Sequence, residues 1–241
     1  MTPLLSVRKL EAFYGAAQIL FGVDLDLADG EVVALMGRNG AGKSTTMKAI
    51  MGLVARKNGA VTFRDADVSR DRPYQIARRG LGFVPEDRRI FGDLTVSENL
   101  EVGRLPARGA DGSPPREPWT KERLFALFPN LAEAQHRPAA RMSGGEQQML
   151  SVARTLMGNP TAILLDEPSE GVAPIIVEAM ARTIQSLKAS GVSILLSEQN
   201  FLFASSVADR VYVLEKGEVR WSGAMSTLKR DENTRRAYLE V

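Results

Sequence analysis

The sequence contains no cysteine and only one histidine among its 241 residues. Without cysteine the chain can form neither disulfides nor cysteine metal sites, and thiol catalysis is excluded. No stretch approaches the ~18 uninterrupted apolar residues that a membrane span requires. The first residues, MTPLLS, lack the basic start and the long apolar stretch of a secretion signal. We therefore expect a cytoplasmic protein.

Neither sign of charge is in excess, because 31 Lys and Arg face 29 Asp and Glu. A net charge of +2 with interspersed signs gives no ground for a nucleic-acid partner. Charged residues make up 25% and apolar residues 44% of the chain, as in an ordinary soluble protein with a sizeable core. The length fits one domain, which we expect to span residues 1–241.

Short apolar runs rich in β-branched residues alternate with amphipathic stretches. The runs that indicate buried strands are residues 31–36, 81–85, 162–165 and 193–196. Continuous apolar runs of this length suit a parallel sheet that is covered on both faces. Helices are predicted over 43 to about 53 and over 177–188. The pattern predicts an α/β fold with a mainly parallel sheet.

Other segments predict strands outside that sheet. We expect residues 1–28, 59–64 and 210–221 to form an additional antiparallel layer. A hairpin turn is predicted at Lys216 and Gly217.

Residues 96–157 indicate mainly helices, interrupted at 104–118 by an arginine-rich loop crowded with glycine and proline. We interpret 96–157 as a helical subdomain inserted in a core made of about 1–95 and 158–241.

The segment GRNGAGKS, from Gly37 to Ser44, satisfies the pattern G-x-x-x-x-G-K-[ST] between a predicted strand and a predicted helix. Its backbone N–H groups would point at phosphate oxygens, Lys43 would reach the β- and γ-phosphates, and Ser44 would bind Mg²⁺. A tight glycine turn is the alternative, and roughly one chain in a hundred would show the pattern by chance. The predicted nucleotide-binding residues of this loop are Gly37, Asn39, Gly40, Ala41, Gly42, Lys43, Ser44 and Thr45.

A second motif is the apolar run 162–165 followed by Asp166 and Glu167. Ligands of α/β sheets bind at the carboxyl ends of the strands, so both acids can face a nucleotide. We predict that Asp166 holds Mg²⁺ through water and that Glu167 accepts a proton from the attacking water. The alternative is a pair of surface acids in the turn before Pro168.

A third motif is the segment MSGGEQQ, residues 142–148. It predicts a capping box in which Ser143 is the N-cap of a helix and Glu146 is its N3 residue. A helix that begins behind two glycines can also bind an anion.

In this order, the three motifs resemble those of ABC-transporter ATPases over essentially the whole chain. The resemblance implies a P-loop NTPase core that uses ATP and Mg²⁺. Two ATPase domains of that family pair head to tail, so Ser143, Gly144 and Gly145 would complete the partner's nucleotide site; we call these three the signature residues. The family's adenine-stacking aromatic corresponds to Tyr14, for which a core tyrosine is the alternative.

Segments 83–91, 166–171 and 197–200 are similar to one branch, the smaller ATPase subunit of branched-chain amino acid uptake systems. This resemblance implies a peripheral protein on the cytoplasmic face of the plasma membrane. Its partners would be a second ATPase subunit, transmembrane permease subunits and, indirectly, a solute-binding protein. Whether the ATPase pair is a homodimer or a heterodimer stays open.

Three positions depart from the family pattern. Glu86 replaces the loop glutamine that senses Mg²⁺, and Gln199 replaces the switch histidine. We keep both as catalytic residues with Lys43 and Glu167, and Glu86 also as a metal ligand. Ala173 replaces an aspartate that contacts the partner ATPase. We expect these departures to slow ATP hydrolysis rather than to abolish it.

Other functions fit the same motifs. One is an ATPase for lipopolysaccharide export or for urea or amide uptake, which only its partner subunits would distinguish. Another is a soluble ABC ATPase of DNA repair or translation, although those carry long coiled coils or a second nucleotide domain. The last alternative is a regulatory nucleotide-binding module that does not hydrolyse ATP. The single histidine, His136, is expected to be an exposed surface residue.

Overall fold

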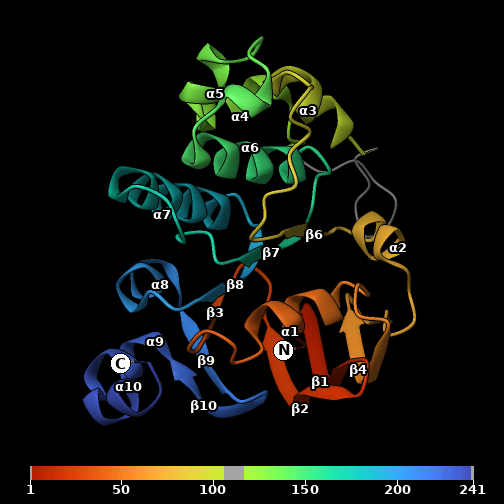
Figure 1. Ribbon diagram of the computed structural model, residues 1–241, viewed down its shortest axis with the longest axis vertical. Coiled ribbons are helices and arrows are strands. Elements are labelled where there is room, and N and C mark those ends of the chain that lie inside the picture. The colour runs from red at the N-terminus through yellow and green to blue at the C-terminus, as the bar shows by residue number, and fades with distance from the viewer. Residues whose placement is uncertain (1, 106–116, 240–241) are drawn as a thin grey trace.

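A computed structural model describes residues 2–105 and 117–239. Two β-sheets lie in the lower part of the molecule, and a group of helices lies above them (Figure 1). Residues 106–116, which hold most of the predicted loop 104–118, lie outside the described residues.

The larger sheet has six strands in the order β10-β9-β3-β8-β7-β6. Its strands are β3 (Val32–Met36), β6 (Leu81–Val84), β7 (Ala162–Asp166), β8 (Ser193–Glu198), β9 (Arg210–Glu215) and β10 (Glu218–Ala224). All neighbouring pairs are parallel except β9 with β10. The four buried strands expected from the sequence are confirmed, and the carboxyl ends of β3, β7 and β8 lie side by side.

The smaller sheet is antiparallel, with the order β2-β1-β4-β5. It consists of β1 (Leu5–Tyr14), β2 (Ala17–Leu27), β4 (Arg56–Phe63) and β5 (Ala66–Asp67). The antiparallel layer expected from residues 1–28 and 59–64 is therefore confirmed.

The assignment of residues 210–221 to that antiparallel layer is wrong. Strand β9 instead pairs in parallel with β3, from Val33 opposite Arg210 to Met36 opposite Val213. Its central residues are buried, and a run that is apolar on both faces is stabilised between two layers rather than at a surface. The hairpin turn itself is confirmed, because Lys216 and Gly217 have φ angles of 49° and 80°, as a two-residue turn of this kind requires.

The helices connect and cover these strands. They are α1 (Lys43–Ile50), α2 (Pro73–Arg78), α3 (Val96–Val102), α4 (Lys121–Leu127), α5 (Pro129–Glu133), the 3₁₀ turn η1 (Ala139–Arg141), α6 (Gly144–Leu156), α7 (Pro174–Ala189), α8 (Phe201–Val207), α9 (Met225–Arg230) and α10 (Glu232–Tyr238). Helix α1 ends before the predicted residue 53 because Gly52, at φ 69°, turns the chain. Helix α7 begins earlier than predicted, with Pro174 in its first turn, where proline is favoured.

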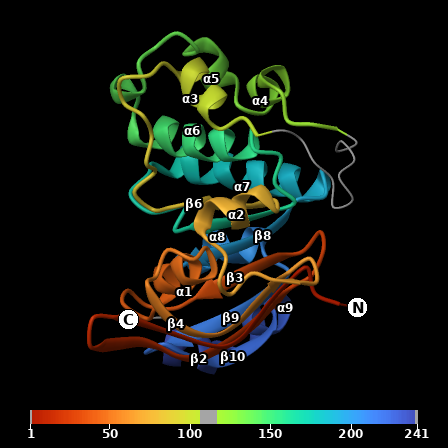
Figure 2. The ribbon, with the colours of Figure 1, turned by 90° about the vertical axis from the view of Figure 1, so that its right-hand side faces the viewer.

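Two apolar clusters lie on opposite faces of the six-stranded sheet. Val32, Ala34 and Met36 of β3 pack with helices that include α3, α6, α7 and α8. Val33 and Leu35 pack with α1 and with the antiparallel sheet. Helix α1 therefore lies between the two sheets, and the antiparallel sheet lies in the lower part of the molecule, on the side away from the upper helices (Figure 2). The loop between β3 and α1 is therefore held at both of its ends, because β3 and α1 are each packed in an apolar cluster.

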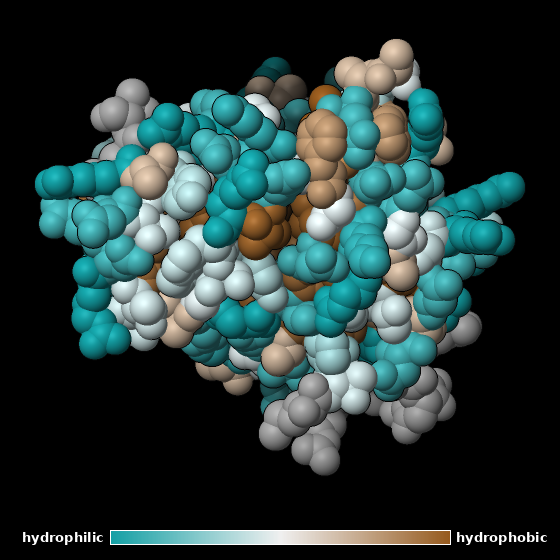
Figure 3. Space-filling model, turned by 90° about the horizontal axis from the view of Figure 1, so that it is seen from below, coloured by the Kyte–Doolittle hydropathy of each residue, from teal (hydrophilic) through white to brown (hydrophobic). Residues whose placement is uncertain are grey.

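The face seen from below is mainly hydrophilic, with apolar residues showing in small areas near its centre (Figure 3). A scattered pattern of this kind is normal for a surface in contact with water. Among the described residues, no helix combines the length and the apolar composition that crossing a membrane demands.

Candidate functional site

The loop between β3 and α1 has the geometry of an anion site. Gly40 and Gly42 have φ angles of 78° and 108°, which only glycine adopts readily. A side chain at Gly37 would overlap the carbonyl oxygen of Leu214, and a Cβ atom at Gly42 would lie 2.8 Å from Leu20. Helix α1 has no side-chain cap at Gly42 and no acid in its first turn, so its first N–H groups remain available to an anion.

Lys43 lies across this loop and is buried. Its Nζ donates to the carbonyl oxygens of Gly37 at 2.8 Å and Arg38 at 3.1 Å. The same Nζ forms an ion pair with Glu167 Oε1 at 3.0 Å. The structure therefore brings together Lys43 and Glu167, which lie far apart in the sequence. Asn39 and Gly40 are exposed at the tip of the loop, while Ser44 and Thr45 are half-buried in the first turn of α1.

Asp166 ends β7 and is fully buried. Its Oδ1 accepts a hydrogen bond from Ser197 Oγ at 2.6 Å, whereas Oδ2 has no hydrogen-bond partner within the described residues. Burial raises the pKa of the Asp166 carboxyl, and interactions with Ser197 and Ser44 oppose this rise. The unpartnered Oδ2 of Asp166 and the hydroxyl of the nearby Ser44 are both oxygen donors, which is the kind of ligand that Mg²⁺ prefers.

Glu167 follows Asp166 with a left-handed backbone, at φ 47°. Its N–H donates to the carbonyl oxygen and to the hydroxyl of Ser197, at 3.2 and 3.1 Å, which fixes this unusual conformation. Burial raises the pKa of the Glu167 carboxyl, but the hydrogen bonds with Glu170 and Lys43 lower it by more than burial raises it. The pKa of Glu167 therefore lies below the ordinary value. Glu167 is therefore ionised at neutral pH and can accept a proton.

Glu170 is a neighbour of Glu167 to which we assigned no role from the sequence. Its hydrogen bond to Glu167, together with burial and the charges of Glu167 and Glu86, raises the pKa of Glu170 to about 7. At neutral pH and below, Glu170 can donate this proton to the Glu167 carboxylate. In the sequence, the only sign of this role was that Glu170 follows the predicted catalytic acid by three residues. The contact itself could not be predicted, because it depends on the turn of the chain at Glu167.

The Glu170 contact predicts a pH-dependent stability. Because the folded pKa of Glu170 is about 7 against 4.5 ordinarily, its stabilising contribution is present below about pH 4.5 and is lost as the pH rises through about 7. Glu170→Gln keeps a hydrogen-bond donor but does not titrate. We expect the thermal midpoint of the nucleotide-free variant to fall less between about pH 5 and pH 8 than that of the wild type. Parallel curves would show that Glu170 does not share a proton with Glu167.

The remaining predicted residues lie around this centre. Gln199 is half-buried directly after β8, the strand next to β7. Glu86 is exposed after β6, and its charge contributes to the raised pKa of Glu170. Tyr14 ends β1 with 50% of its surface exposed, which excludes the alternative of a core tyrosine and leaves its ring accessible.

The signature residues are held at the start of α6, away from α1. Ser143 Oγ accepts the N–H of Glu146 at 3.3 Å, and Glu146 Oε2 accepts the N–H of Ser143 at 2.8 Å, so the predicted capping box is confirmed. Gly145 packs against Ile176 of α7, where a Cβ atom would lie 2.6 Å from the isoleucine side chain. Helix α6 packs mainly against α3, α5 and β6. Helix α1, which follows the phosphate loop, packs instead mainly against β1, β2, β7 and β8.

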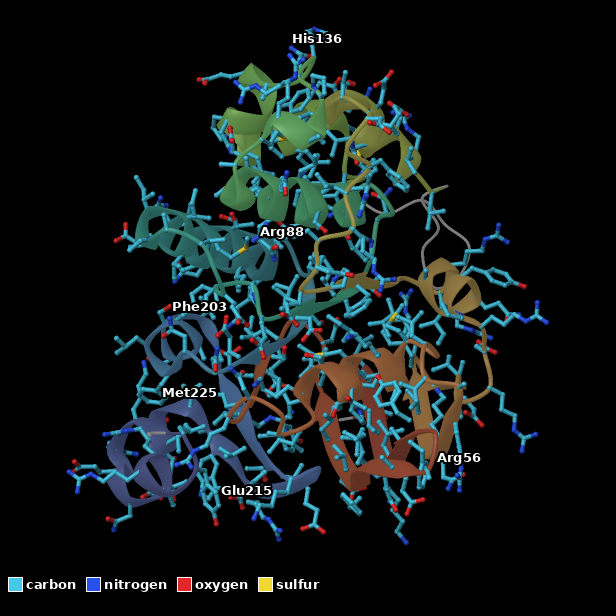
Figure 4. The ribbon with its side chains drawn as sticks, viewed as in Figure 1. Arg56, Arg88, His136, Phe203, Glu215 and Met225 are labelled. Atoms are coloured by element: carbon cyan, nitrogen blue, oxygen red, sulfur yellow. The ribbon has the colours of Figure 1, made fainter. Side chains whose placement is uncertain are left out.

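His136 is exposed and lies at the end of the upper helices farthest from the two sheets (Figure 4). The expectation of an exposed surface histidine therefore holds. A direct part in chemistry at Lys43 and Glu167 is excluded within one chain.

Comparison with known proteins places this geometry in a family. The family model described as "ABC transporter" matches residues 20–170. BraG of Pseudomonas aeruginosa, a high-affinity branched-chain amino acid transport ATP-binding protein, is 38% identical, and the alignment covers 98% of this chain and 99% of BraG. The lipopolysaccharide export ATP-binding protein LptB of Escherichia coli is 34% identical, with coverage of 98% and 96%.

Solved structures agree with these relatives. The ATP-binding subunit of an ABC transporter is 30% identical, with a TM-score of 0.80 and coverage of 98% of this chain and 96% of that chain. A further ATP-binding cassette of an ABC transporter is 26% identical, with a TM-score of 0.81 and coverage of 98% and 97%. The predicted fold, a mainly parallel sheet with an antiparallel β-layer and helices, is confirmed. The chain therefore belongs to the ABC transporter family and is one of its ATP-hydrolysing, ATP-binding subunits.

Proposed function

We propose that this chain energises a multi-subunit importer for branched-chain or other hydrophobic amino acids. The observation that carries the proposal is the 38% identity to BraG over nearly the full length of both chains. LptB, at 34% over a similar span, supports export of lipopolysaccharide as the second candidate. The substrate would be selected by membrane and solute-binding subunits, and this chain would act at the cytoplasmic face of the membrane.

The site supports a division of roles among its residues. The residues proposed to bind the nucleotide are Tyr14 with the adenine and Gly37, Asn39, Gly40, Ala41, Gly42, Lys43, Ser44 and Thr45 with the phosphates. Ser44, Asp166 and Glu86 would hold Mg²⁺, which when bound neutralises phosphate charge. Glu167 would accept the proton of the attacking water, and Gln199 would donate a hydrogen bond to the γ-phosphate.

The different packing partners of α1 and α6 support a head-to-tail pair. The signature residues begin a helix that packs against α3, α5 and β6, so we propose that they serve the nucleotide of a second ATPase subunit. We propose that the helical subdomain of residues 96–157 transmits the closing of this pair to the permease.

A groove beside these helices supports docking of a permease. It has a volume of about 320 Å³, and its lining includes Phe83, Phe91, Val102 and Arg154. Phe91 and Val102 are 47% and 53% exposed, and the Arg154 guanidinium lies 5.1 Å from the centre of the Phe91 ring. Exposed apolar side chains in a concave surface indicate a protein contact. We propose that a cytoplasmic segment of the permease binds here.

Co-purification with the permease subunits tests this contact. Val102→Lys places a charge in the groove, and burying an unpaired charge is costly, so we expect the permease to be lost. Leu53→Lys is the matched control, because Leu53 is 45% exposed but does not line the groove. ATPase activity of either isolated variant should stay within about twofold of wild type. Retention of the permease by Val102→Lys would place the contact elsewhere.

Transport assays test the substrate. Membrane vesicles that hold the permease complex with the ATPase and MgATP inside should accumulate labelled leucine that is supplied outside together with the solute-binding protein. Glu167→Gln provides the matched complex without turnover. Hydrolysis without uptake of leucine, isoleucine or valine would contradict amino-acid import, and ATP-driven release of lipopolysaccharide would establish the second candidate.

A further inference from the structure

Glu198 is a buried carboxylate to which none of the roles above applies. It is the last residue of β8, with only 1% of its surface exposed. Its neighbour Ser197 lies opposite Asp166 in the parallel ladder, so Glu198 lies at the same edge of the sheet as the candidate site. A buried carboxylate is costly unless it is fully hydrogen-bonded, so its partners show what it stabilises.

Three backbone N–H groups bind the Glu198 carboxylate. Oε1 accepts the N–H of Ser169 at 3.0 Å. Oε2 accepts the N–H groups of Gln199 and Asn200, each at 3.1 Å. These partners come from two loops: Ser169 lies two residues after Glu167, and Asn200 is the N-cap of α8, where its Oδ1 binds the N–H of Phe203 at 3.1 Å.

The carboxylate therefore connects the two loops that carry Glu167 and Gln199. Burial raises the pKa of the Glu198 carboxyl, and its hydrogen bonds with Ser169 and Asn200 oppose this rise by favouring the ionised form. Hydrogen bonds to an ionised acceptor are about twice as strong as neutral ones, so these contacts restrain both loops. Both loops leave the sheet at neighbouring strands, β7 and β8, and each would otherwise have an unsatisfied N–H group. Removing the carboxylate would release both loops together.

We propose that Glu198 is a positioning residue that fixes Gln199 relative to Glu167 by binding the backbone of both loops. The inference deepens the proposed function, since it requires that Glu167 and Gln199 act on the same ATP. Glu198 touches neither phosphate nor water in this scheme, and it acts only through the two loops. Its loss should therefore lower kcat and leave ATP affinity unchanged.

Glu198→Gln tests this proposal with little change in volume. The amide retains one acceptor oxygen but turns an NH₂ group toward backbone N–H groups, so at least one of the three hydrogen bonds is lost. We expect kcat to fall by about 10- to 100-fold, with KM and the affinity of the monomer for ATP within about twofold. Glu198→Asp keeps the charge but is one methylene shorter, and it should show an intermediate kcat.

Glu31→Gln is the matched structural control. Glu31 precedes β3, at the opposite end of the sheet, and its carboxylate binds the Ala28 N–H and the Arg210 guanidinium. Its variant should lower the thermal midpoint without changing kcat. If Glu198→Gln likewise changes only the thermal midpoint, Glu198 has a structural role and the proposal is wrong. If Glu198→Gln does not fold, Glu198→Asp takes its place: a lower kcat supports the proposal, and a change in the thermal midpoint alone contradicts it.

A double-mutant cycle separates this inference from the proposed function. If Glu198 acts by fixing Gln199 relative to Glu167, then Glu198→Gln should cost at least about threefold less in kcat when Gln199 is already alanine than it costs in the wild type. Additive losses would overturn the inference alone. A wild-type rate for Gln199→Ala would remove Gln199 from the mechanism, and the inference with it. Wild-type turnover in Glu167→Gln would instead overturn the proposed roles at the site.

Discussion

Glu167→Gln is expected to lower ATP turnover by about 10²- to 10⁴-fold while leaving ATP binding intact. The Glu167 carboxyl is ionised at neutral pH, because its hydrogen bonds with Glu170 and Lys43 outweigh the effect of burial on its pKa. An amide has almost the same shape and its oxygen can still accept from Lys43, but it cannot take a proton from water. Phosphate release measures turnover, and a fluorescent ATP analogue measures affinity.

A second readout makes this prediction specific. If hydrolysis reopens the pair of ATPase subunits, the variant should accumulate ATP-bound dimers, which size-exclusion chromatography with MgATP detects. Glu178→Gln is the control, because Glu178 is an exposed glutamate on α7 with only a 4.0 Å ion pair to Arg182. Turnover near the wild-type rate in Glu167→Gln would remove Glu167 from the mechanism and leave the base to be found elsewhere.

Much of the site could be predicted because its residues follow buried strands. The phosphate loop follows β3, the pair Asp166 and Glu167 falls at the end of β7, and Gln199 follows β8. In each case a local pattern gives both the strand and the polar residue at its carboxyl end. The parallel sheet then brings these ends together without any further information from the sequence.

The contributions of Glu170 and Glu198 could not be predicted in this way. Glu198 also ends an apolar strand, so the rule that identified Asp166 marks its position, but its role depends on hydrogen bonds with Ser169 and Asn200 that only the folded loops form. The raised pKa of Glu170 depends on the left-handed turn at Glu167. Contacts between loops of different strands are therefore the part that local patterns leave undetermined.

The error at residues 210–221 has a related cause. A hairpin at the edge of a parallel sheet and a hairpin in a separate antiparallel sheet have the same turn residues and the same apolar runs. What distinguishes them is the pairing of β9 with β3, a contact between distant parts of the chain. The buried run from Val211 to Leu214 was the available signal, because a strand with one exposed face would alternate.

Ser143→Asp is expected to abolish ATP-driven dimerisation while leaving the ATP affinity of the monomer nearly unchanged. Aspartate is as good an N-cap as serine, so α6 and its capping box should persist. The new charge would lie where we propose that the partner's γ-phosphate binds. Two like charges about 4 Å apart repel by about 4 kcal/mol at the effective dielectric of a protein surface, which corresponds to a roughly 10³-fold weaker dimer.

The matched control is Ser143→Asn, which caps the helix equally well but adds no charge. Both variants are made in the Glu167→Gln background, where ATP-bound dimers should persist long enough for size-exclusion chromatography, and with the second ATPase subunit present if a different chain co-purifies. The asparagine variant should still dimerise. Because Ser143 is exposed and the start of α6 packs against Ile176 rather than against α1, neither change should disturb the phosphate loop of its own chain. Loss of ATP binding by the Ser143→Asp monomer would mean that the signature residues serve the nucleotide of the same chain, and the head-to-tail pair would be wrong.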